Sequence, residues 1–499
     1  MAAIPIDVEK HSEINHAESY SDIAQNQKIV NEAGRLATIA EHDLTFRQAV
    51  KAYPRAIFWS VLVSTCIIME GYDVVLVGSM FGQPAFQEKY GNYYSDLKGY
   101  QLSGPWQVAL GNSGNIGAIL GCFANGYFVQ LFGYRRVLLV SLFLVAAFVF
   151  IVFFAQNLPT LLTGEILLGL PWGVFASMAP AYASEVCPVA LRGYLTVYVN
   201  LCWAFGQLIG AGVNEGFQPL TTEWAYRVPF AIQWVWPIPL AAILFFAPES
   251  PWWLVHKERF EEAERTVKRL GSKSMTGDDA KKSVAMMCWL GWDVELYSSG
   301  ASSCWLILAW LFLYYTSLGP VTYAIISETS AIKLRNKSVC LARIGYVGLD
   351  GTSNYIRLGP LLAVRSDVTR LILAWLFLYY TSLGPVTYAI ISETSAIKLR
   401  NKSVCLARIG YYLVGILVGT IQPYMLNPTE GNWKGKTCLF WAGTSFLAWL
   451  WSYFRVPETA GRTYEELDIL FANKVSARKF AKTTVDAYAD TGESRIKQE

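Results

Sequence analysis

Charged residues are scarce in this chain of 499 residues. Asp, Glu, Lys and Arg make up 16% of it, whereas about a quarter is usual for soluble globular domains. Hydrophobic residues make up 53%, and the four histidines lie in polar stretches. This composition argues against a soluble protein and leaves no intramembrane histidine relay. A formal net charge of +3 without a dominant basic tract gives nucleic-acid binding no electrostatic basis.

Paired cysteine motifs are missing as well. The nine cysteines are scattered, and most lie in apolar runs, where cysteine behaves as a small hydrophobe. A zinc site or a disulfide framework is therefore not expected. No Ser/His/Asp constellation suggests an enzyme, and the string Gly431–Thr437 is one residue short of a phosphate-binding loop. We expect no enzymatic activity, no metal and no cofactor.

Long apolar runs, by contrast, are abundant. A helix of about 20 residues spans a bilayer. Ten runs reach or approach this length: 56–80, 105–129, 136–155, 159–182, 194–214, 226–247, 305–327, 370–392, 409–425 and 437–455. They predict an all-α membrane protein with about ten transmembrane helices.

The same pattern divides the chain into five parts. Residues 1–52 are polar, without the apolar segment of a signal peptide, and are expected to form a cytoplasmic tail. We then predict a six-helix N-terminal half (53–248), a cytoplasmic loop (249–303), an incomplete C-terminal half (304–456) and a cytoplasmic C-terminal tail (457–499). Lys and Arg in the short loops, such as Arg135, Arg136 and Arg192, place the N-terminus in the cytoplasm.

An exact repeat interrupts the C-terminal half. Residues 306–346 (copy one) and 371–411 (copy two) are identical throughout. Repeats normally diverge because only their hydrophobic pattern is needed. The identity therefore indicates a recent duplication or an error in the assembled gene. Crossing the membrane, copy one would place its four basic residues outside, against the positive-inside rule, whereas copy two obeys it. We predict that copy one is not a regular transmembrane helix.

Four motifs lie at the ends of expected helices: Gly126–Arg136, Pro180–Gly193, Pro248–Leu254 and Pro457–Arg462. In this order they resemble the sugar-porter branch of the major facilitator superfamily. Four further stretches are similar to fungal α-glucoside (maltose-type) permeases: Glu70–Asp73, Gly164–Phe175, Pro423–Thr429 and Ala472–Phe480. The resemblance covers about 47–270 and 370–488. It implies a major-facilitator-type helix bundle in which the family's seventh to ninth helices have no counterpart.

Ionisable residues inside membrane spans are costly and are functional candidates by default. Glu70 and Asp73 are three apart on one expected helix, so they share a face. By resemblance, Glu165 and Arg408 complete a proton-coupling set with them. The alternative is structural ion pairing.

Sugar binding requires hydrogen-bonding groups and an aromatic surface. Asn200 and Gln207 are two helical turns apart on one expected helix, and Tyr388 and Tyr411 match the family's pocket positions on its tenth and eleventh helices. The alternative for these residues is helix packing, with the tyrosines at the lipid interface.

The family also carries ion pairs at the cytoplasmic helix ends, which lock the outward-facing state. By resemblance, this gate comprises Gly133, Arg135, Arg136, Glu185, Arg192 and Glu249 in the N-terminal half, and Glu393, Arg400 and Glu458 in the C-terminal half. The alternative is a set of solvated loop charges.

Three pairs of glycines have GxxxG spacing: Gly117/Gly121, Gly206/Gly210 and Gly415/Gly419. The resemblance implies that Gly117/Gly121 meet Gly415/Gly419. It also implies that Gly206/Gly210 face the missing eighth helix.

The resulting hypothesis is a secondary active sugar transporter that takes up α-glucosides such as maltose with protons. Its partners would be the sugar, protons and the lipid bilayer, with no nucleic acid and no obligatory protein partner. It would be a multi-pass protein of the plasma membrane. Two alternatives remain: a non-functional or truncated paralogue of such a transporter, including a gene-model artefact, and a sugar sensor that does not transport.

Overall fold

The structure is a computed structural model that describes residues 44–94, 99–272, 275–292, 400–426, 433, 436–455, 466–467, 469–470, 473, 475–485 and 496–498. Its helices are α2 (Phe46–Ala52), α3 (Pro54–Thr65), α4 (Ile67–Met80), α5 (Pro84–Tyr90), α6 (Gly104–Phe132), α7 (Tyr134–Phe153), α8 (Leu158–Val186), α9 (Val189–Phe217), α10 (Trp224–Ile232), α11 (Pro237–Leu244), α12 (Pro251–His256), α13 (Phe260–Leu270), α14 (Gly277–Trp292), α19 (Arg400–Leu426) and α20 (Lys436–Arg455). Two 3-10 helices, η2 (Gln233–Val235) and η5 (Ala477–Lys482), accompany them. The strands β1 (Asn92–Tyr94) and β2 (Gly99–Gln101) form one antiparallel hairpin, and β3 (Thr483–Val485) and β4 (Ile496–Gln498) form another.

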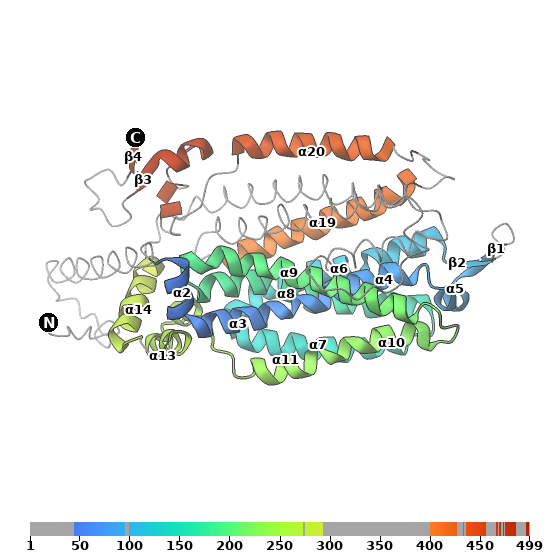
Figure 1. Ribbon diagram of the computed structural model, residues 1–499, viewed down its shortest axis with the longest axis horizontal. Coiled ribbons are helices and arrows are strands. Elements are labelled where there is room, and N and C mark those ends of the chain that lie inside the picture. Colours follow the sequence, from blue (N-terminus) through green and yellow to red (C-terminus); the bar gives the residue numbers. More distant parts are fainter. Residues whose placement is uncertain are drawn as a thin grey trace, which may run out of the picture.

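Seven helical stretches in the described part of the chain are long and apolar enough to cross a membrane: Pro54–Met80, Gly104–Phe132, Tyr134–Phe153, Leu158–Val186, Ala190–Phe217, Trp224–Leu244 and Lys402–Ile421. The first six run side by side in one bundle (Figure 1) and agree with the six spans expected for the N-terminal half. The expected spans 305–327 and 370–392 lie outside the described residues. The helix α20 matches the last expected range but is not among the seven.

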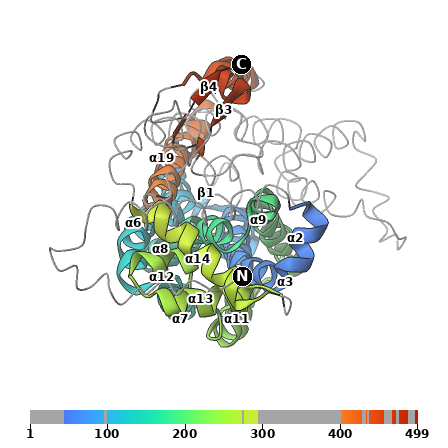
Figure 2. The same cartoon turned by 90° about the vertical axis from the view of Figure 1, so that its left-hand side faces the viewer.

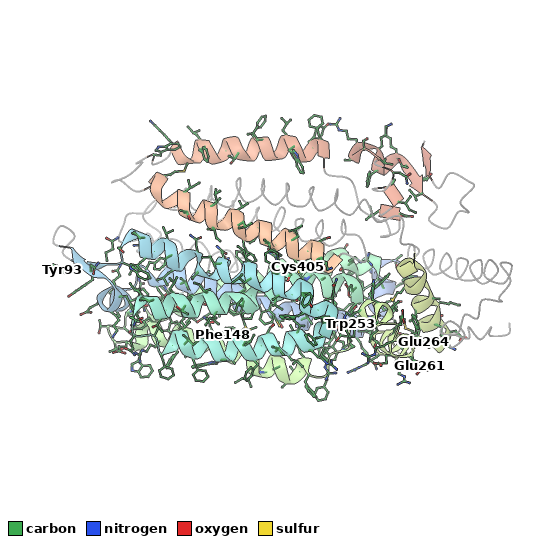
Figure 3. All side chains as sticks on the ribbon, turned by 180° about the vertical axis from the view of Figure 1, so that it is seen from behind. Tyr93, Phe148, Trp253, Glu261, Glu264 and Cys405 are labelled. Carbon is green, nitrogen blue, oxygen red and sulfur yellow. The ribbon has the colours of Figure 1, made fainter. Side chains whose placement is uncertain are left out.

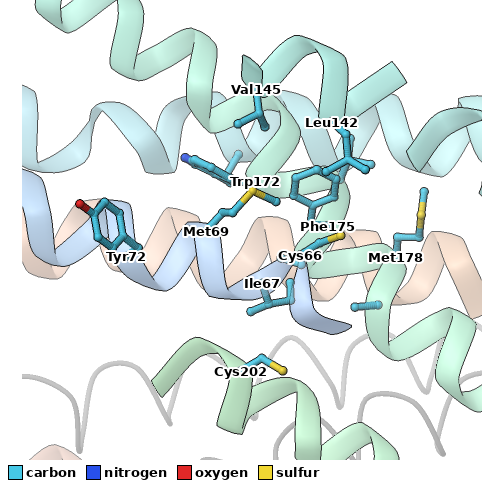
Figure 4. Packing of buried hydrophobic residues seen from close by; sticks show 14 of the residues in the cluster. Cys66, Ile67, Met69, Tyr72, Leu142, Val145, Trp172, Phe175, Met178 and Cys202 are labelled. Carbon is cyan, nitrogen blue, oxygen red and sulfur yellow. The ribbon is translucent and has the colours of Figure 1, made fainter. Parts of the chain in front are cut away.

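The core of the bundle lies around α8, whose small residues let its neighbours approach from several sides. Trp172 and Phe175 of α8 pack there with Ile67 and Met69 of α4 and with Leu142 of α7 (Figure 4). All five side chains are buried. Burial of large apolar side chains on every side of α8 fixes its position relative to α4.

Glycines bring the helices of the N-terminal half into close contact, and they do so differently from the expectation. A Cβ on Gly117 would overlap the carbonyl oxygen of Ile166 in α8, and one on Gly121 would overlap that of Leu170. Likewise, a Cβ on Gly206 would overlap the carbonyl oxygen of Ile68 in α4. The expected partners of these two glycine pairs were therefore wrong. Both pairs pack against helices of their own half.

One described helix of the C-terminal half, α19, leans against α6 (Figure 2). It begins at Arg400, well before the expected start at 409, because polar residues such as Ser403 and Arg408 are part of the helix. Towards one end, Asn112 Nδ2 of α6 donates a hydrogen bond of 3.4 Å to Thr420 Oγ1. Towards the other end, Cys405 packs on Gly126 (Figure 3). The contact between α6 and α19 therefore follows most of the length of both helices.

The helices α12, α13 and α14 pack against one another at the same end of the bundle as α2 (Figure 1). The backbone N–H of Ser272, which follows α13, donates a hydrogen bond of 2.7 Å to the carbonyl oxygen of Ala52 at the end of α2. The positive-inside rule predicts that this end is cytoplasmic and that the hairpin of β1 and β2, at the opposite end, lies outside.

Candidate functional site

The two carboxylates of α4 are both buried, with exposed fractions of 6% for Glu70 and 3% for Asp73. Although they are three residues apart, they have different partners. Glu70 Oε1 accepts a hydrogen bond of 2.9 Å from Tyr412 Oη of α19. Asp73 Oδ1 accepts one of 2.7 Å from Gln233 Nε2 of η2. The shared face that the sequence predicts is therefore divided between two neighbouring elements.

The other two residues of the expected proton-coupling set lie beside these carboxylates. Glu165 of α8, 1% exposed, lies beside Asp73, and Trp172, two helical turns further along α8, lies near the same carboxylate. Arg408 of α19, 4% exposed, lies near enough to Glu70 for their charges to interact. The structure thus brings all four residues together as two pairs, Asp73 with Glu165 and Glu70 with Arg408.

Arg408 also connects the two halves of the molecule. Its Nε donates a hydrogen bond of 3.2 Å to the carbonyl oxygen of Ala176 in α8. Its guanidinium carbon lies 5.2 Å from the ring centroid of Tyr411, within the range of a cation–π contact. A cation held in this way lies at the contact between α19 and the N-terminal bundle, where its charge is poorly screened by water.

The expected sugar-binding residues are found in two places. Asn200 and Gln207 are buried on α9, whose Gly206 contacts α4. Tyr411 is half-buried on α19 under the Arg408 guanidinium. Tyr388 lies outside the described residues. Their role in sugar binding stays a prediction.

At the end of the bundle that is expected to be cytoplasmic, Glu249 binds the start of α7. Its carboxylate accepts hydrogen bonds from the backbone N–H groups of Tyr134 (2.7 Å) and Arg135 (3.3 Å). These N–H groups have no partner within the helix, and the positive end of the helix dipole favours an anion there. Burial raises the pKa of Glu249 above its ordinary value, and the backbone donors partly oppose this.

Gly133 makes room for that carboxylate. Its φ of 85° lies in the left-handed region that favours glycine. A Cβ at this position would lie 2.6 Å from Glu249 Oε2. The glycine that separates α6 from α7 is therefore required both by the turn and by the carboxylate.

Glu185 binds hydroxyl groups. Tyr134 Oη donates to Glu185 Oε1 at 2.8 Å, and Ser250 Oγ donates to Oε2 at 2.5 Å. Arg192 is buried, and its Nε donates to the carbonyl oxygen of Ser184 at 3.1 Å. The expected ion-pair cluster needs a correction at Glu185 and Glu249. The hydrogen-bond donors to these two carboxylates are main-chain N–H groups and hydroxyls.

The remaining gate residues are less informative. The Arg135 guanidinium lies 5.0 Å from the ring centroid of Phe245, and Arg136 is exposed. Arg400 is the first residue of α19. Glu393 and Glu458 lie outside the described residues, so the C-terminal part of the gate stays a prediction.

Sequence reasoning missed Gln233, Trp172 and Tyr412. Gln233 is a single amide in the apolar run 226–247, so the rule that selected Glu70 could also have selected it. Trp172 lies within the stretch Gly164–Phe175 that carried the resemblance. Tyr412 directly follows the end of copy two and gave no separate signal.

The sequence profile of the family described as "Sugar (and other) transporter" matches residues 59–288 and 366–471. Copy two lies inside the second matched range, and copy one lies between the two ranges. The general α-glucoside permease of Saccharomyces cerevisiae is 33% identical over 95% of this chain and 87% of its own length. Maltose permease MAL31 of the same organism is 34% identical over 90% of this chain and 81% of its own.

Among solved structures, the proton:xylose symporter XylE bound to 6-bromo-6-deoxy-D-glucose superimposes with a TM-score of 0.66. The match covers 83% of this chain and 99% of that one at 19% identity. An identity this low shows the fold alone, and the fold is the helix bundle of the major facilitator superfamily. With a family match over most of the chain and permeases at a third identity over nearly all of it, this multi-pass membrane protein belongs to the sugar (and other) transporter family.

Proposed function

We propose that this chain is a secondary active transporter that takes up α-glucosides such as maltose together with protons across the plasma membrane. The names of its relatives support the class of sugar. The observation that carries proton coupling is the buried group of Glu70, Asp73, Glu165 and Arg408 at the contact of α4, α8 and α19.

The chemistry of this group suits a proton carrier. Three carboxylates with one nearby cation cannot all be ionised at low cost in a poorly hydrated site, so at least one of them favours its protonated form. A proton bound there neutralises charge at the contact between the halves. Sugar and proton together then favour the switch between outward-open and inward-open states.

The test is sugar-induced alkalinisation. Cells that lack α-glucoside uptake are made to express the chain, and surface delivery is confirmed by labelling. We expect maltose to raise the pH of a weakly buffered suspension. Sugar entry without alkalinisation removes the symport claim. Surface delivery without sugar entry favours the truncated paralogue or the non-transporting sensor.

Asp73→Asn refines the test, because the amide keeps the shape of the side chain and cannot titrate. We expect this variant to lose proton-driven accumulation of sugar while sugar exchange across the membrane continues. Equal loss of accumulation and exchange would make Asp73 a structural residue.

A further inference from the structure

Two hydrogen-bond donors, Gln233 and Tyr412, each bind one carboxylate of α4. The Gln233 amide donates to Asp73 at 2.7 Å, and the Tyr412 hydroxyl donates to Glu70 at 2.9 Å. Both donors are buried, with exposed fractions of 1% and 3%. Each reaches its carboxylate from a different half of the molecule, and this difference separates their tasks.

The surroundings of Asp73 belong to the N-terminal half. Gln233 comes from η2, and Glu165 and Trp172 come from α8. The 3-10 segment η2 interrupts the sixth span between α10 and α11, and such interruptions are frequent at functional positions.

A second bond holds the sixth span against α4. Tyr72 Oη donates a hydrogen bond of 2.6 Å to the carbonyl oxygen of Pro229 in α10. Because α4, α8 and the sixth span pack within one half, Asp73 keeps these neighbours when the two halves rock against each other.

The surroundings of Glu70 are shared between the two halves. Tyr412 and Arg408 reach it from α19, Cys122 faces it from α6, and Asp73 lies near it on its own helix. A hydrogen bond to an ionised carboxylate is stronger than one to a neutral acid. Protonating Glu70 therefore weakens its attraction to both Tyr412 and Arg408, and with it the contact between the halves.

We infer that Gln233 and Tyr412 are positioning residues with separate tasks in the proposed proton-coupled uptake, on which this inference rests. Gln233 holds Asp73 in place within the N-terminal half in every state of the transport cycle. Tyr412 ties Glu70 to the C-terminal half in one state and releases it in the other. The pair of Asp73 and Glu165 then holds the proton. The protonation state of Glu70 determines how strongly the C-terminal half is attracted to α4.

The experiment uses the full chain reconstituted into lipid vesicles, with maltose as the probe. Two readouts are measured: accumulation driven by a pH gradient, and counterflow, in which labelled sugar exchanges without a gradient. We expect Gln233→Met to behave like Asp73→Asn, with accumulation reduced about tenfold, as for loss of one hydrogen bond to a charged group, and counterflow retained. We expect Tyr412→Phe to change the counterflow rate about as strongly, since counterflow requires the halves to move.

Double-mutant cycles test the pairing directly, because residues in contact show non-additive effects. Tyr412→Phe should add little to Glu70→Gln and its full effect to Asp73→Asn. Gln233→Met should add little to Asp73→Asn and its full effect to Glu70→Gln. A general loss of packing would not produce this selective pattern.

Matched controls remove the same donor groups where they bind backbone carbonyl oxygens instead of carboxylates. Tyr90→Phe removes a tyrosine hydroxyl that donates to the carbonyl oxygen of Ala155 at 2.9 Å. Gln83→Leu removes an amide that donates to the carbonyl oxygen of Ala225 at 2.7 Å. Both should leave the ratio of accumulation to counterflow at the wild-type value. If Gln233→Met does not fold, Gln233→Asn replaces it, because asparagine keeps the amide on a shorter side chain. We expect this variant to reduce accumulation less than Gln233→Met does and to retain counterflow.

The outcomes separate the inference from the function on which it rests. A wild-type protein that neither accumulates nor exchanges maltose overturns the proposed function, and the inference falls with it. A wild type that accumulates maltose, combined with additive cycles for both pairs, overturns the inference alone. So does a Tyr412→Phe variant with unchanged counterflow.

Discussion

Glu249 illustrates what a sequence can and cannot tell about a single residue. The family resemblance places this carboxylate near Arg135 and Arg136 and so predicts an ion pair. In the structure the carboxylate binds the backbone N–H groups at the start of α7. Charges can be read from the sequence, whereas free N–H groups depend on how the chain turns at Gly133. The location of the gate residues was therefore predictable, but the donors to Glu249 were not.

We predict that Gly133→Ala destabilises the protein. The alanine needs a left-handed backbone conformation, and its Cβ would press on Glu249 Oε2, so the free energy of unfolding should fall by about 1–3 kcal/mol. The measurement is the thermal unfolding midpoint of the detergent-solubilised protein. The control is Gly212→Ala, because its Cβ on α9 would meet no atom within 4 Å. Equal midpoints for both variants would contradict the role of the turn.

The raised pKa of Glu249 predicts a pH dependence of stability. A carboxyl whose pKa is raised by folding favours the folded state while protonated, and this contribution is lost as the pH rises through the folded pKa. Glu249→Gln cannot titrate. The midpoint of the wild type minus that of the variant should therefore decrease as the pH rises from about 4, near the ordinary pKa of glutamate, through the raised pKa of Glu249. A difference that stays constant over this range would count against burial as the dominant influence on Glu249.

At the scale of the helix, hydropathy located the spans of the N-terminal half well, since length and apolar content decide whether a helix can cross a bilayer. It did not locate irregularities inside a span, such as the 3-10 segment η2 that carries Gln233. It also did not identify the partners of the glycines. Gly117 and Gly121 show that close packing is needed, but which helix fills the space depends on the three-dimensional arrangement.

The contact between α6 and α8 gives a prediction at this scale. In Gly121→Ala the new methyl group would overlap the carbonyl oxygen of Leu170, so the helices must separate, and we expect the unfolding midpoint to fall by several degrees. The control on the same helix is Gly111→Ala, where a Cβ meets nothing within 4 Å and the higher helix propensity of alanine should leave the midpoint unchanged or slightly raised. A Gly121→Ala variant as stable as Gly111→Ala would show that α6 and α8 are not in close contact.

At the scale of the whole molecule, the two halves differ in how far sequence reasoning reaches. The N-terminal half follows a family pattern without interruption from residue 59 to 288, and its six spans agree with expectation. In the C-terminal half the family match resumes only at 366. Composition predicts that copy one can be helical, but composition alone cannot say where a second identical string would pack. The count of ten helices therefore stays a prediction.

Glycosylation can test the topology of the repeat. Both copies carry an acceptor, Asn336-Lys-Ser and Asn401-Lys-Ser. Because the positive-inside rule opposes translocation of the basic end of copy one, we expect no glycan at either site. The measurement is a mobility shift after glycosidase treatment. The positive control is Tyr94→Thr, which creates an acceptor at the exposed Asn92 of the outer hairpin. A glycan lost in Asn336→Gln would contradict the prediction.

The hydrogen bond from Tyr412 to Glu70 has a consequence for how the protein is made. Copy one leaves the ribosome before copy two and carries the same Cys and Arg that α19 presents to α6 and α8. Their sequences first differ directly after the repeat, where copy two is followed by Tyr412 and copy one by Val347. Tyr412, and after it Thr420, make contacts that the residues following copy one cannot copy. The part of this contact that distinguishes the two copies is therefore synthesised only after both of them, beginning with Tyr412.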